Sequence, residues 1–467
     1  MDKVVKTLRE AIQLCGLEDG MTVSFHHHLR NGDYVLNMAM DEIAAMGIKG
    51  LTVNASSFFD CHAPLAGHIQ SGVVRKLQCN YMSSVLGRQI VNGLMEEPVE
   101  FRTHGGRASD MQLGRTPVDL AILAAPTSDT MGNCSGKHGK SACGSLGYAF
   151  ADAQYAKKVI IVTDNLVPYP LTDFSLPETC ADYVVAVESI GDPKGIVSGT
   201  TKITRDPVGL IMAETAAKVI EASGLLQDGF AFQTGAGGAS LAAAKYLKDI
   251  MLRKGVQGSY ALGGITGYMV DMLRAGCFKS LMDVQCFDLD AVASICSDPR
   301  HREVSAMQYA GPASKSSCVD SLDTVILGAT EIDTDFNVNV HTDSTGCIIG
   351  GSGGHSDTAA GAKLAMIIAP LVRARLPIVT DRVGCLTTPG KTIDVLVTQR
   401  GVAVNPQRTE LRDRLVEAGI HVVDIHDLKR VAEEISGIPA KRENTGRVCA
   451  KVFYRDGSVI DEIRTIR

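Results

Sequence analysis

The stretch VDLAILAAPTSD at residues 118–129 decides the fold, because a similar stretch, LDTVILGATEID, stands at residues 322–333. In both, an aspartate (Asp119 and Asp323, 204 positions apart) precedes a nearly unbroken apolar run. Such a run predicts a short strand that is buried on both faces, as in the parallel sheets of α/β proteins. The chain therefore contains two copies of one predicted strand.

Four further pairs of segments match in the same order. They are DGMTVSF from Asp19 with DGFAFQTG from Asp228, MGIKGLTVNASS from Met46 with KGVQGSYALGGITG from Lys254, SGVVRKLQCNY from Ser71 with AGCFKSLMDVQCFD from Ala275, and VIIVTD ending at Asp164 with LPIVTD ending at Asp381. Unrelated apolar βα units are the alternative explanation, but five matches in one order favour an internal repeat. We predict an α/β fold of two tandem, internally repeated domains, residues 1–200 and 201–467, with mostly parallel sheets.

Short apolar runs alternate with longer helical ones along the chain. The expected strands include Met21–Phe25, Gly50–Asn54, Leu120–Ala124, Val159–Thr163, Thr324–Leu327 and Ile378–Thr380. The expected helices are Pro207–Glu221, Leu241–Lys254, Ala359–Arg375, Thr409–Ala418 and Asp427–Ser436. We expect residues 179–205 to cross between the domains, and Arg455–Ser458 to be the turn of a hairpin that completes the edge of the second domain.

Composition excludes several classes of protein. There are 46 basic and 52 acidic residues, few aromatic residues and no tryptophan, which argues against a nucleic-acid ligand. The 13 scattered cysteines, an odd number, predict free thiols rather than a disulfide framework. No apolar window is long enough to span a membrane, and the N-terminal helix lacks the apolar core of a signal peptide. We therefore expect a cytoplasmic protein.

Two glycine-rich turns follow predicted strands of the second domain. In TGCIIGGSGGHSDTAAGAKLAMIIA, residues 345–369, a strand at Cys347–Ile349 leads into four glycines and then into a helix near Asp357. Glycines let backbone N–H groups approach a ligand, and a helix N-terminus favours negative charge. Asp357 suits either a helix cap or a ligand contact. The second turn, FQTGAGGAS from Phe232, does not fit the dinucleotide-binding fingerprint, and neither turn has a P-loop lysine.

Loops of the first domain carry basic side chains. The three histidines of SFHHHLRNGD, residues 24–33, are consecutive and do not all point one way, so we expect no metal site there. Cys134, His138 and Cys143 lack zinc spacing and a fourth ligand, so they predict no metal either. The loops are either a solvated basic surface or a site for a ligand with several carboxylates. Their other positive groups are Arg102, His104, Arg107, Lys137, His138 and Lys140.

Several of these motifs resemble a known family. The two α/β domains, the two glycine turns and GGSGGHSDTAAGAK from Gly350 resemble the CoA-transferases. The resemblance is more specific to the α-subunit family of bacterial citrate lyase in LTVNASSF, HIQSGVVRKLQCNYM, HGGRASDMQLG and GNCSGKHGKSACG. It extends from Lys3 to the C-terminus, although the N-terminus is somewhat shorter than is usual in that family.

The resemblance implies a reaction and a set of partners. Citrate and an acetyl thioester would give a citryl thioester and acetate. The thiol would be the prosthetic group of the acyl carrier (gamma) subunit, or free CoA as its analogue, and a beta (lyase) subunit would cleave the citryl thioester. The resemblance further implies a homo-oligomer within that complex and no tightly bound cofactor, and we expect neither nucleic acid nor membrane as a partner.

One position departs from the wider superfamily. Many CoA-transferases carry a nucleophilic glutamate at the place occupied here by Gly263 and Gly264, in GSYALGGITG. A glutamyl thioester is therefore not expected at that place, although Glu331 remains an acid elsewhere. The other route is direct, with a citrate carboxylate attacking the acetyl thioester to give a mixed anhydride. This route needs substrate positioning and oxyanion donors rather than a protein nucleophile.

The expected site residues form three groups. The catalytic group is Gly263, Gly264, Gly353 and Gly354. The thioester or CoA group is Gly235, Gly237, Gly238, Gly350, Gly351 and Asp357, with Asp357 fixing the turn. The citrate group is His26, His27, His28, Arg30, Asn54, Ser56, Ser57 and Arg107. Two other functions are considered: a transferase or thioester hydrolase for a monocarboxylate, which needs the missing glutamate, and a non-catalytic scaffold for an acyl carrier, which needs degraded glycine turns.

Overall fold

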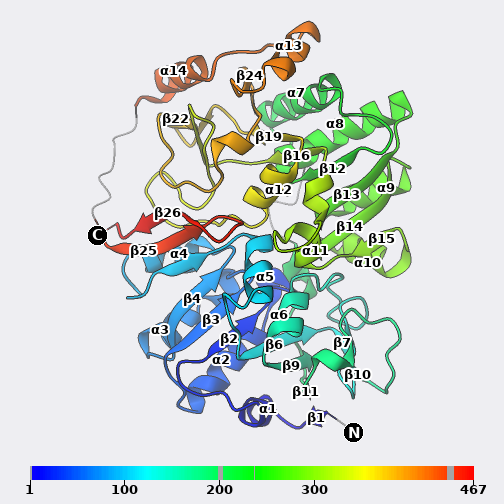
Figure 1. The fold of residues 1–467 in the computed structure, drawn as a ribbon, viewed down its shortest axis with the longest axis vertical. Helices are drawn as coiled ribbons and strands as arrows, with labels where there is room; N and C mark the ends of the chain where they lie inside the picture. Colours follow the sequence, from blue (N-terminus) through cyan, green and yellow to red (C-terminus); the bar gives the residue numbers. More distant parts are fainter. Residues whose placement is uncertain (1–2, 198–202, 236, 439–445, 467) are drawn as a thin grey trace.

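Two α/β bodies are stacked along the long axis of the molecule (Figure 1). The computed structural model of the protein describes residues 3–197, 203–235, 237–438 and 446–466. Each body is built on one large, mostly parallel sheet, which confirms the predicted fold class. Within these ranges, no helix is long and apolar enough to cross a membrane.

The first sheet has ten strands in the described chain, and all neighbours are parallel except the last pair. In spatial order they are β1 (Val4–Val5), β11 (Tyr183–Ala186), β9 (Lys158–Thr163), β6 (Leu120–Ala125), β2 (Thr22–Phe25), β3 (Leu51–Ala55), β4 (Val74–Cys79), β5 (Val99–Phe101), β25 (Val448–Phe453) and β26 (Val459–Arg464).

The second sheet has eight described strands with the same pattern of pairing. In spatial order they are β15 (His301–Glu303), β14 (Phe278–Cys286), β13 (Gly258–Ile265), β12 (Ala231–Thr234), β16 (Thr324–Leu327), β19 (Leu364–Ile368), β23 (Val395–Thr398) and β24 (Gly401–Val404).

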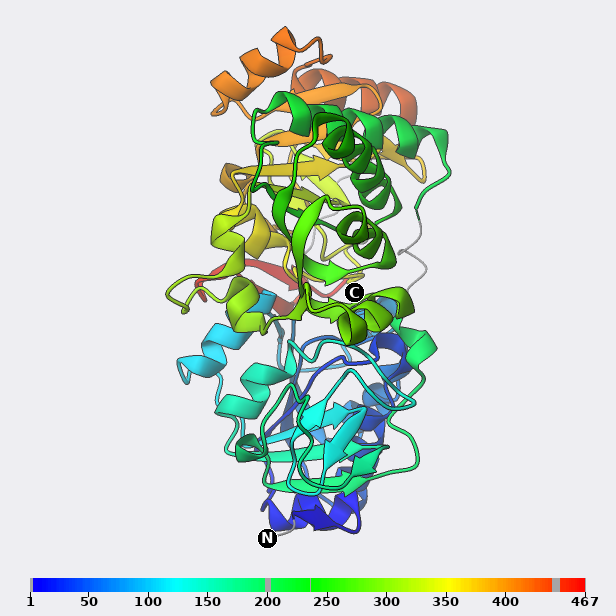
Figure 2. The same cartoon turned by 90° about the vertical axis from the view of Figure 1, so that its right-hand side faces the viewer.

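Helices connect successive strands and cover the sheets (Figures 1 and 2). The first body has α1 (Leu8–Leu14), α2 (Val35–Ala45), α3 (Leu65–Gln70), α4 (Ser84–Val91), α5 (His104–Gln112) and α6 (Ala149–Tyr155). The second has α7 (Pro207–Ala222), α8 (Gly238–Lys254), α9 (Gly267–Arg274), α10 (Leu289–Ser297), α11 (Ala306–Ala310), α12 (His355–Gly361), α13 (Thr409–Glu417) and α14 (Ile425–Ser436).

Each body also carries a small three-stranded sheet. The first is β10 (Leu166–Val167), β7 (Thr127–Asp129) and β8 (Cys134–Ser135), and the second is β22 (Val379–Thr380), β17 (Glu331–Asp333) and β18 (Val338–Asn339). A two-stranded ribbon joins β20 (Val372–Arg373) to β21 (Leu376–Pro377). The small sheets have the same internal order, as expected of a repeat.

The predicted repeat is confirmed by the strand order and by one shared interaction. The series β11-β9-β6-β2-β3-β4-β5 corresponds to β23-β19-β16-β12-β13-β14-β15. Asp119 Oδ2, before β6, accepts the backbone N–H of Thr22 at 2.8 Å, and Asp323 Oδ2, before β16, accepts that of Ala231 at 2.8 Å. In both halves this aspartate ties together the starts of two neighbouring strands, which explains why it recurs before the apolar run.

Some predicted elements differ from the structure. Residues 359–375 are not a helix, because α12 ends at Gly361 and Leu364–Ile368 is the buried strand β19. The fifth sequence match was wrong: the counterpart of β9 is β19, and the segment ending at Asp381 contributes β22, the counterpart of β10. Short apolar runs fit a strand or a buried helix equally well, and only pairing distinguishes them.

The C-terminal hairpin also lies elsewhere than expected. The turn at Arg455–Ser458 is confirmed, but β25 pairs in parallel with β5 and thereby extends the first sheet, not the second. The two views show the hairpin between the bodies (Figures 1 and 2). The last strands of the chain thus cross back to the N-terminal half and couple the two bodies.

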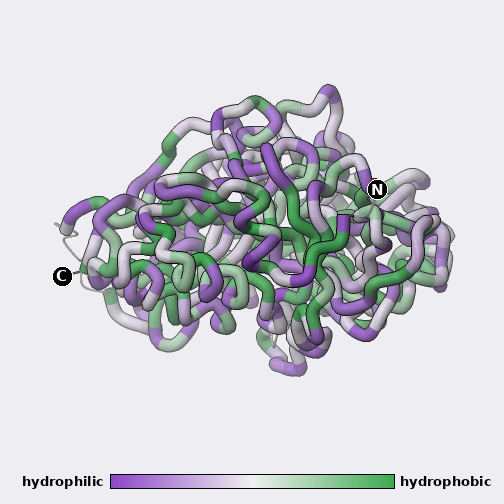
Figure 3. Tube along the Cα trace, turned by 90° about the horizontal axis from the view of Figure 1, so that it is seen from below, coloured by the Kyte–Doolittle hydropathy of each residue, from purple (hydrophilic) through white to green (hydrophobic). Residues whose placement is uncertain are grey.

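Apolar residues fill the interior of both bodies. The large sheets and their helices contribute a continuous set of side chains with almost no exposure, including Phe25, Phe101, Phe232 and Phe278. Seen from below, hydrophobic segments run through the centre and hydrophilic ones dominate the rim (Figure 3). All 13 cysteines are free, as expected.

Helices α5 and α11 cross closely where the bodies meet. A Cβ atom built on Gly105 of α5 would lie 1.9 Å from the backbone oxygen of Ala310 in α11. Only glycine fits this contact, so the helix crossing sets how near the bodies can approach.

We expect Gly105→Ala to lower the free energy of unfolding by about 1–3 kcal/mol, because the added methyl must push the two helices apart. The matched control is Gly67→Ala in α3, where nothing lies within 4 Å of the new Cβ and the change should be neutral or stabilise by up to about 1 kcal/mol. Urea denaturation of both variants checks this. Equal effects would contradict the close crossing.

Candidate active site between the two sheets

The candidate site lies where the carboxyl ends of the two sheets meet. Gln285, near the end of β14, donates from Nε2 to the backbone oxygen of His27, just beyond β2, at 2.7 Å. The backbone N–H of His104 donates to Gly353 O at 2.8 Å, and that of Gly353 donates to Asn80 O, just beyond β4, at 3.1 Å. Ligands of open α/β sheets bind outside the carboxyl ends of the strands, and here two such ends face each other.

Three aromatic rings from the first body form the floor of this junction. The ring centroid of Tyr148 lies 4.5 Å from that of His27 and 4.4 Å from that of His104. Burial, then the nearby His104 and Arg30, holds the pKa of His27 well below its usual range. Burial and Arg107 lower the pKa of His104 to about 3. Both imidazoles are therefore neutral at pH 7, which corrects the expectation that His104 adds positive charge.

The contacts of His27 set the position of its proton. Ser56 Oγ, just beyond β3, accepts the backbone N–H of His27 at 3.0 Å and also contacts its Nδ1. Among the described residues Nδ1 is the acceptor available to the Ser56 hydroxyl proton. The serine therefore donates to Nδ1, and the imidazole proton is on Nε2. His27 thus presents a neutral N–H donor.

Side chains from the second body close the opposite wall. Gln233 Nε2, on β12, donates to the hydroxyl oxygen of Tyr309 at 2.9 Å. A Cβ built on Gly354 would lie 2.3 Å from that oxygen, and one built on Gly263 would lie 2.8 Å from Gln233 Nε2. Gly263 has φ +106 and sits at an irregularity in the pairing of β13 with β14. Two of the predicted catalytic glycines, from distant parts of the chain, therefore adjoin one hydrogen-bonded pair.

Gly264 and Arg30 share a partner. A Cβ on Gly264 would lie 2.2 Å from the ring of Phe287, and the Arg30 guanidinium carbon lies 4.4 Å from the centroid of that ring. Arg30 Nη1 donates to the backbone oxygen of Ile196 at 3.1 Å. Phe287 is thus packed between a backbone without a side chain and a cation.

Arg30 is the basic side chain of this site that has no carboxylate partner among the described residues. Burial lowers the pKa of Arg30 from its usual value, against smaller raising effects of Tyr81 and Tyr148. Its backbone is in the left-handed region, with φ +54, where strain commonly marks a functional residue. A partly buried, unpaired guanidinium suits a carboxylate ligand.

The glycine turn at residues 350–354 is shaped by packing. A Cβ on Gly350 would lie 2.4 Å from Val340 O, and one on Gly351 would lie 2.2 Å from Asn80 O of the first body. The predicted strand Cys347–Ile349 is wrong, since only Ile348 makes an isolated bridge, with Thr342. Gly351 therefore lets the turn dock on the first body, and Gly350 lets it pack within the second. Gly353, at φ +51, faces the imidazole of His104.

Asp357 joins the two bodies instead of fixing its own turn. Its Oδ1 accepts the Thr103 hydroxyl at 2.9 Å, and its Oδ2 accepts the backbone N–H of Gly105 at 2.9 Å, at the N-terminus of α5. Arg455 Nε, in the terminal hairpin, lies 3.5 Å from Oδ1. Burial raises the pKa of Asp357 to about 6, against the lowering effect of these partners. Because His104 lies between Thr103 and Gly105, this clamp positions it.

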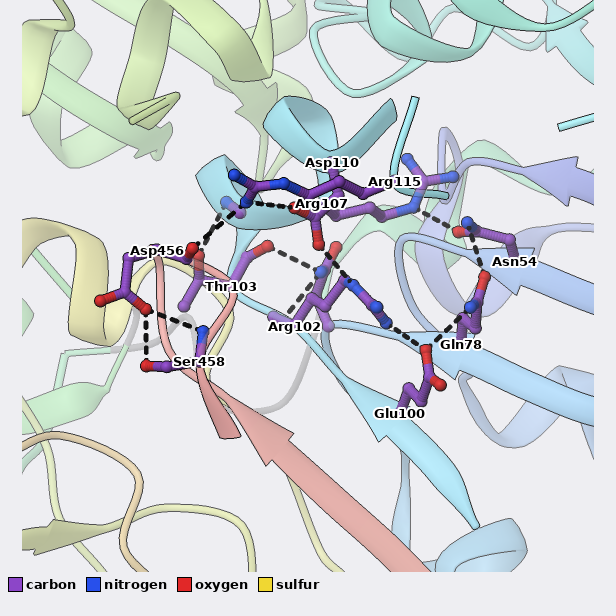
Figure 4. A network of polar contacts seen from close by, with 12 residues as sticks. Asn54, Gln78, Glu100, Arg102, Thr103, Arg107, Asp110, Arg115, Asp456 and Ser458 are labelled. Carbon is purple, nitrogen blue, oxygen red and sulfur yellow. Dashed lines mark hydrogen bonds and ion pairs between the residues drawn. The ribbon is translucent and has the colours of Figure 1, made fainter. Parts of the chain in front are cut away.

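Arg107, expected to bind citrate, is fully engaged in the interior of the first body. Its Nη1 and Nη2 donate to the two carboxylate oxygens of Asp152 at 2.9 and 2.7 Å, and its Nε donates to Asn54 Oδ1 at 2.7 Å. Asn54 in turn donates to Gln78 Oε1 at 3.1 Å (Figure 4). Arg107 and Asn54 are therefore structural, and we remove both from the citrate group.

Three other citrate candidates are buried, and among the described residues the ring nitrogens of His26 and His28 have no hydrogen-bond partner. His26 and His28 are buried against each other, with ring centroids 5.2 Å apart, and His28 Nε2 lies 3.9 Å from Asp33 Oδ1. Burial lowers the pKa of both histidines. Ser57 Oγ donates to the backbone oxygen of Ser56 at 2.7 Å. Of the eight candidates, His27, Arg30 and Ser56 remain at the junction.

The predicted basic loops are largely neutralised. Arg102 pairs with Glu100 at 2.5 Å and with Asp110 at 2.8 Å (Figure 4). Lys137 and His138 both contact Asp173, at 2.7 and 3.1 Å. Lys140 Nζ donates to the backbone oxygen of Glu188. A sequence shows the positive charges, but their acidic partners come from other segments.

The second glycine turn has open space around it. Any Cβ on Gly235 or Gly237 would meet nothing closer than 3.5 Å, and Gly237 caps α8 without a side-chain hydrogen bond. Gly238 is the first residue of α8. Residue 236 lies outside the described chain. The role of this turn in thioester binding remains a prediction.

Cys134, His138 and Cys143 do not come together as a zinc set, since the cysteines are buried and His138 bonds Asp173 at the surface. A different cluster, Asp283, Cys286 and His301, is buried beside β13. Asp283 Oδ2 accepts from Cys286 Sγ at 2.9 Å and contacts His301 Nε2 at 3.0 Å. These side chains form a hydrogen-bonded network around Asp283 Oδ2.

The family model described as "Citrate lyase, alpha subunit" matches residues 1–466 of the chain. The chain belongs to the citrate lyase α-subunit family. It is 48% identical to the citrate lyase alpha chain of Klebsiella pneumoniae over 465 residues, covering 100% of this chain and 92% of the relative. It is also 48% identical to that of Escherichia coli K12, covering 100% and 91%. The expected family is thereby confirmed.

Solved structures agree with the family. A crystal structure described as the α subunit of citrate lyase from Streptococcus mutans, in complex with citrate, matches with a TM-score of 0.98 at 46% identity, covering 100% of this chain and 92% of that one. A Pseudomonas malonate decarboxylase chain (TM-score 0.69, 93% and 86% covered) and a Porphyromonas gingivalis 4-hydroxybutyrate CoA-transferase (TM-score 0.59, 92% and 96% covered) share the fold at 16% identity.

Sequence reasoning missed Tyr148, Gln233, Tyr309 and Asn80 as residues of the site. Gln233 lies two positions before Gly235 of the second glycine turn, and Asn80 follows a predicted strand of the repeat. Their position at the ends of strands was the signal that could have identified them. Tyr148 and Tyr309 lie in helical or loop segments without a motif. Their place at the junction follows only from how the two bodies dock.

We expect Arg107→Met to lower the free energy of unfolding by about 3–5 kcal/mol, because it leaves Asp152 buried and unpaired. The double variant Arg107→Met/Asp152→Leu should recover much of that loss, whereas Arg30→Ala should cost only about 0.5–2 kcal/mol. Urea denaturation measures all three. A larger loss for Arg30→Ala than for Arg107→Met would contradict these assignments.

Proposed function

We propose that this protein is the citrate CoA-transferase subunit of citrate lyase. In this role it exchanges the acetyl group of an acetyl thioester for citryl, giving a citryl thioester and acetate. The observation that carries the proposal is the unpaired Arg30 guanidinium, which adjoins a junction of neutral donors and glycines. The citrate-bound relative, similar over the full chain, supports citrate as the acceptor.

The proposed chemistry is a direct transfer through a mixed anhydride. A citrate carboxylate oxygen attacks the acetyl thioester carbonyl, the C–S bond breaks, and a thiolate leaves. The thiolate then attacks the citryl carbonyl of the anhydride, and acetate leaves. Atoms and charge balance without a protein nucleophile or a proton donor.

The residues of the junction fit this route. Arg30 would hold a citrate carboxylate, and the Nε2–H of His27, set by Ser56, would donate to the oxyanion that forms at the attacked carbonyl. Preorganised donors of this kind, held away from water, are typically worth several kcal/mol of transition-state stabilisation. Gly353 and Gly354 would let the thioester pass between His104 and Tyr309.

The packing around Gly263 and Gly264 leaves no space for a side chain, which supports a route without a glutamyl thioester on the enzyme. Side chains there would collide with Gln233 and Phe287, respectively. Glu331, the acid left open above, accepts the backbone N–H of Gly384 at 2.8 Å and the amide of Asn339 at 2.9 Å in the small sheet. Its carboxylate is thus engaged in holding a turn, and we assign it no catalytic role.

The proposal includes partners that belong to the family. The physiological thioester would be carried by the prosthetic group of an acyl carrier (gamma) subunit, with CoA thioesters as analogues and no tightly bound cofactor in this chain. A beta subunit would cleave the product within a cytoplasmic complex that contains several copies of this chain. Gly235, Gly237 and Gly238 of the second glycine turn are our candidates for contacts with the carrier's pantetheine arm.

Acetyl-CoA and citrate should give acetate. Double-reciprocal plots of the initial rate, measured at several fixed concentrations of the second substrate, should give intersecting lines, because both substrates must be bound before the anhydride forms. Borohydride added with acetyl-CoA should not inactivate the enzyme. Parallel lines, the kinetic mark of a covalent intermediate, together with thioester-dependent inactivation by borohydride, would contradict direct transfer.

Two variants test the roles assigned to Glu331 and Arg30. Glu331→Gln should keep at least about half of the activity, whereas Arg30→Ala should raise the citrate KM by about 10-fold or more, as expected for loss of one charged hydrogen bond, and leave the acetyl-CoA KM unchanged. Loss of activity in Glu331→Gln, together with a borohydride label at Glu331 of the wild-type protein, would assign the nucleophile to Glu331.

A further inference from the structure

His104 exposes a hydrogen-bond acceptor to the junction. This atom, Nε2, receives no hydrogen bond from any described residue. The amide of Asn80 identifies Nε2 as the acceptor, because its Nδ2 donates to the backbone oxygens of Arg102 and Thr103 at 3.0 and 2.9 Å. The atom that faces His104 Nδ1, at 3.2 Å, is therefore the Asn80 oxygen. An amide oxygen only accepts, so the imidazole proton is on Nδ1.

The remaining nitrogen, Nε2, faces the glycine turn. It lies 3.3 Å from the position that a Cβ of Gly353 would occupy, and no hydrogen-bond donor contacts it within the described ranges. The clamp between Asp357 and the N-terminus of α5 holds the residue in this place. Nε2 is not one of the fully enclosed polar atoms without a partner among the described residues, so a donor from a ligand can reach it.

The chemistry of that ligand is restricted. A neutral imidazole nitrogen with a lone pair repels a carboxylate oxygen and accepts from an O–H or N–H group. Once its carboxyl groups are ionised, citrate has a single donor, its tertiary hydroxyl. The ring centroid of His27, whose Nε2–H suits a carbonyl or carboxylate oxygen, lies 6.1 Å from that of His104. A donor ring and an acceptor ring side by side match a carboxylate and a hydroxyl on one carbon.

We infer that His104 Nε2 accepts the hydrogen bond of the citrate hydroxyl and makes this site selective for 2-hydroxy polycarboxylates over their deoxy analogues. The inference rests on the proposed function in taking citrate as the acceptor substrate. An amide N–H of the pantetheine arm offers the same chemistry, and the experiment below separates it from the hydroxyl.

The test compares citrate with tricarballylate, which is citrate without its hydroxyl, using acetyl-CoA as the donor. In the wild type, kcat/KM should favour citrate by about 10- to 100-fold, since the deoxy acid leaves Nε2 unpaired. His104→Phe should lower kcat/KM for citrate by about 10-fold or more relative to tricarballylate, so that the ratio of the two acids approaches one. His104→Gln, whose amide oxygen can accept, should restore part of the preference. His138→Phe, at the surface beside Asp173, is the matched control and should keep the full ratio.

Several results would overturn the inference. An equal loss for both acids in His104→Phe would mean that the residue only packs. A rise in the acetyl-CoA KM with the acid ratio preserved would assign the donor to the pantetheine amide. If the wild type transfers no acyl group, calorimetric titration with the two acids gives the same comparison. Tighter binding of citrate than of tricarballylate that depends on His104 would then support the inference, even though the proposed function fails. Equal binding of the two acids would overturn the inference.

Discussion

A single buried carboxylate connects three parts of the chain that must meet for the junction to exist. Asp357 lies in the first turn of α12, after the glycine turn. It accepts hydrogen bonds from Thr103 and Gly105 at the start of α5 and lies beside Arg455 of the terminal hairpin. Removing a carboxylate from water is costly, and burial accordingly raises its pKa. The helix N-terminus and the hydroxyl donor offset that cost only if the two bodies stay docked.

The consequence of this docking is a site with little free charge. Arg107, Arg102 and Lys137 are each bound to acids of the first body, and the histidines at the junction are neutral. Arg30 is left as the cation for a ligand, in surroundings where a carboxylate would be attracted with little competition. An anhydride route benefits from such a place, because neutral donors stabilise the oxyanion without protonating the attacking carboxylate.

Much of the fold was predictable because it is repeated. Asp119 and Asp323 make the same hydrogen bond in each half, so the sequence around them stayed similar enough to recognise. The strand Leu364–Ile368 was predicted as part of a helix, because a short, fully apolar run has neither the helical nor the strand periodicity of polar residues. The place of the hairpin was missed for a different reason: β25 pairs with β5 across almost the whole chain, and no local pattern encodes a partner at that distance.

The candidate site was predictable only in outline. Glycine turns at strand ends indicated the candidate junction, which Gly263, Gly264, Gly353 and Gly354 adjoin. Arg107 and Asn54, predicted to bind citrate, are held instead by Asp152 and Gln78, and these partners come from other elements. The protonation of His104 on Nδ1 follows from the orientation of the Asn80 amide, which depends on tertiary contacts that the sequence does not show.

The central claim, that citrate binds at this junction on Arg30, is tested most directly by a crystal structure of the protein with citrate. We predict a citrate carboxylate within about 3 Å of the Arg30 guanidinium nitrogens, with Arg107 still bound to Asp152. Citrate seated on Arg107, or outside the space between the two sheets, would contradict it.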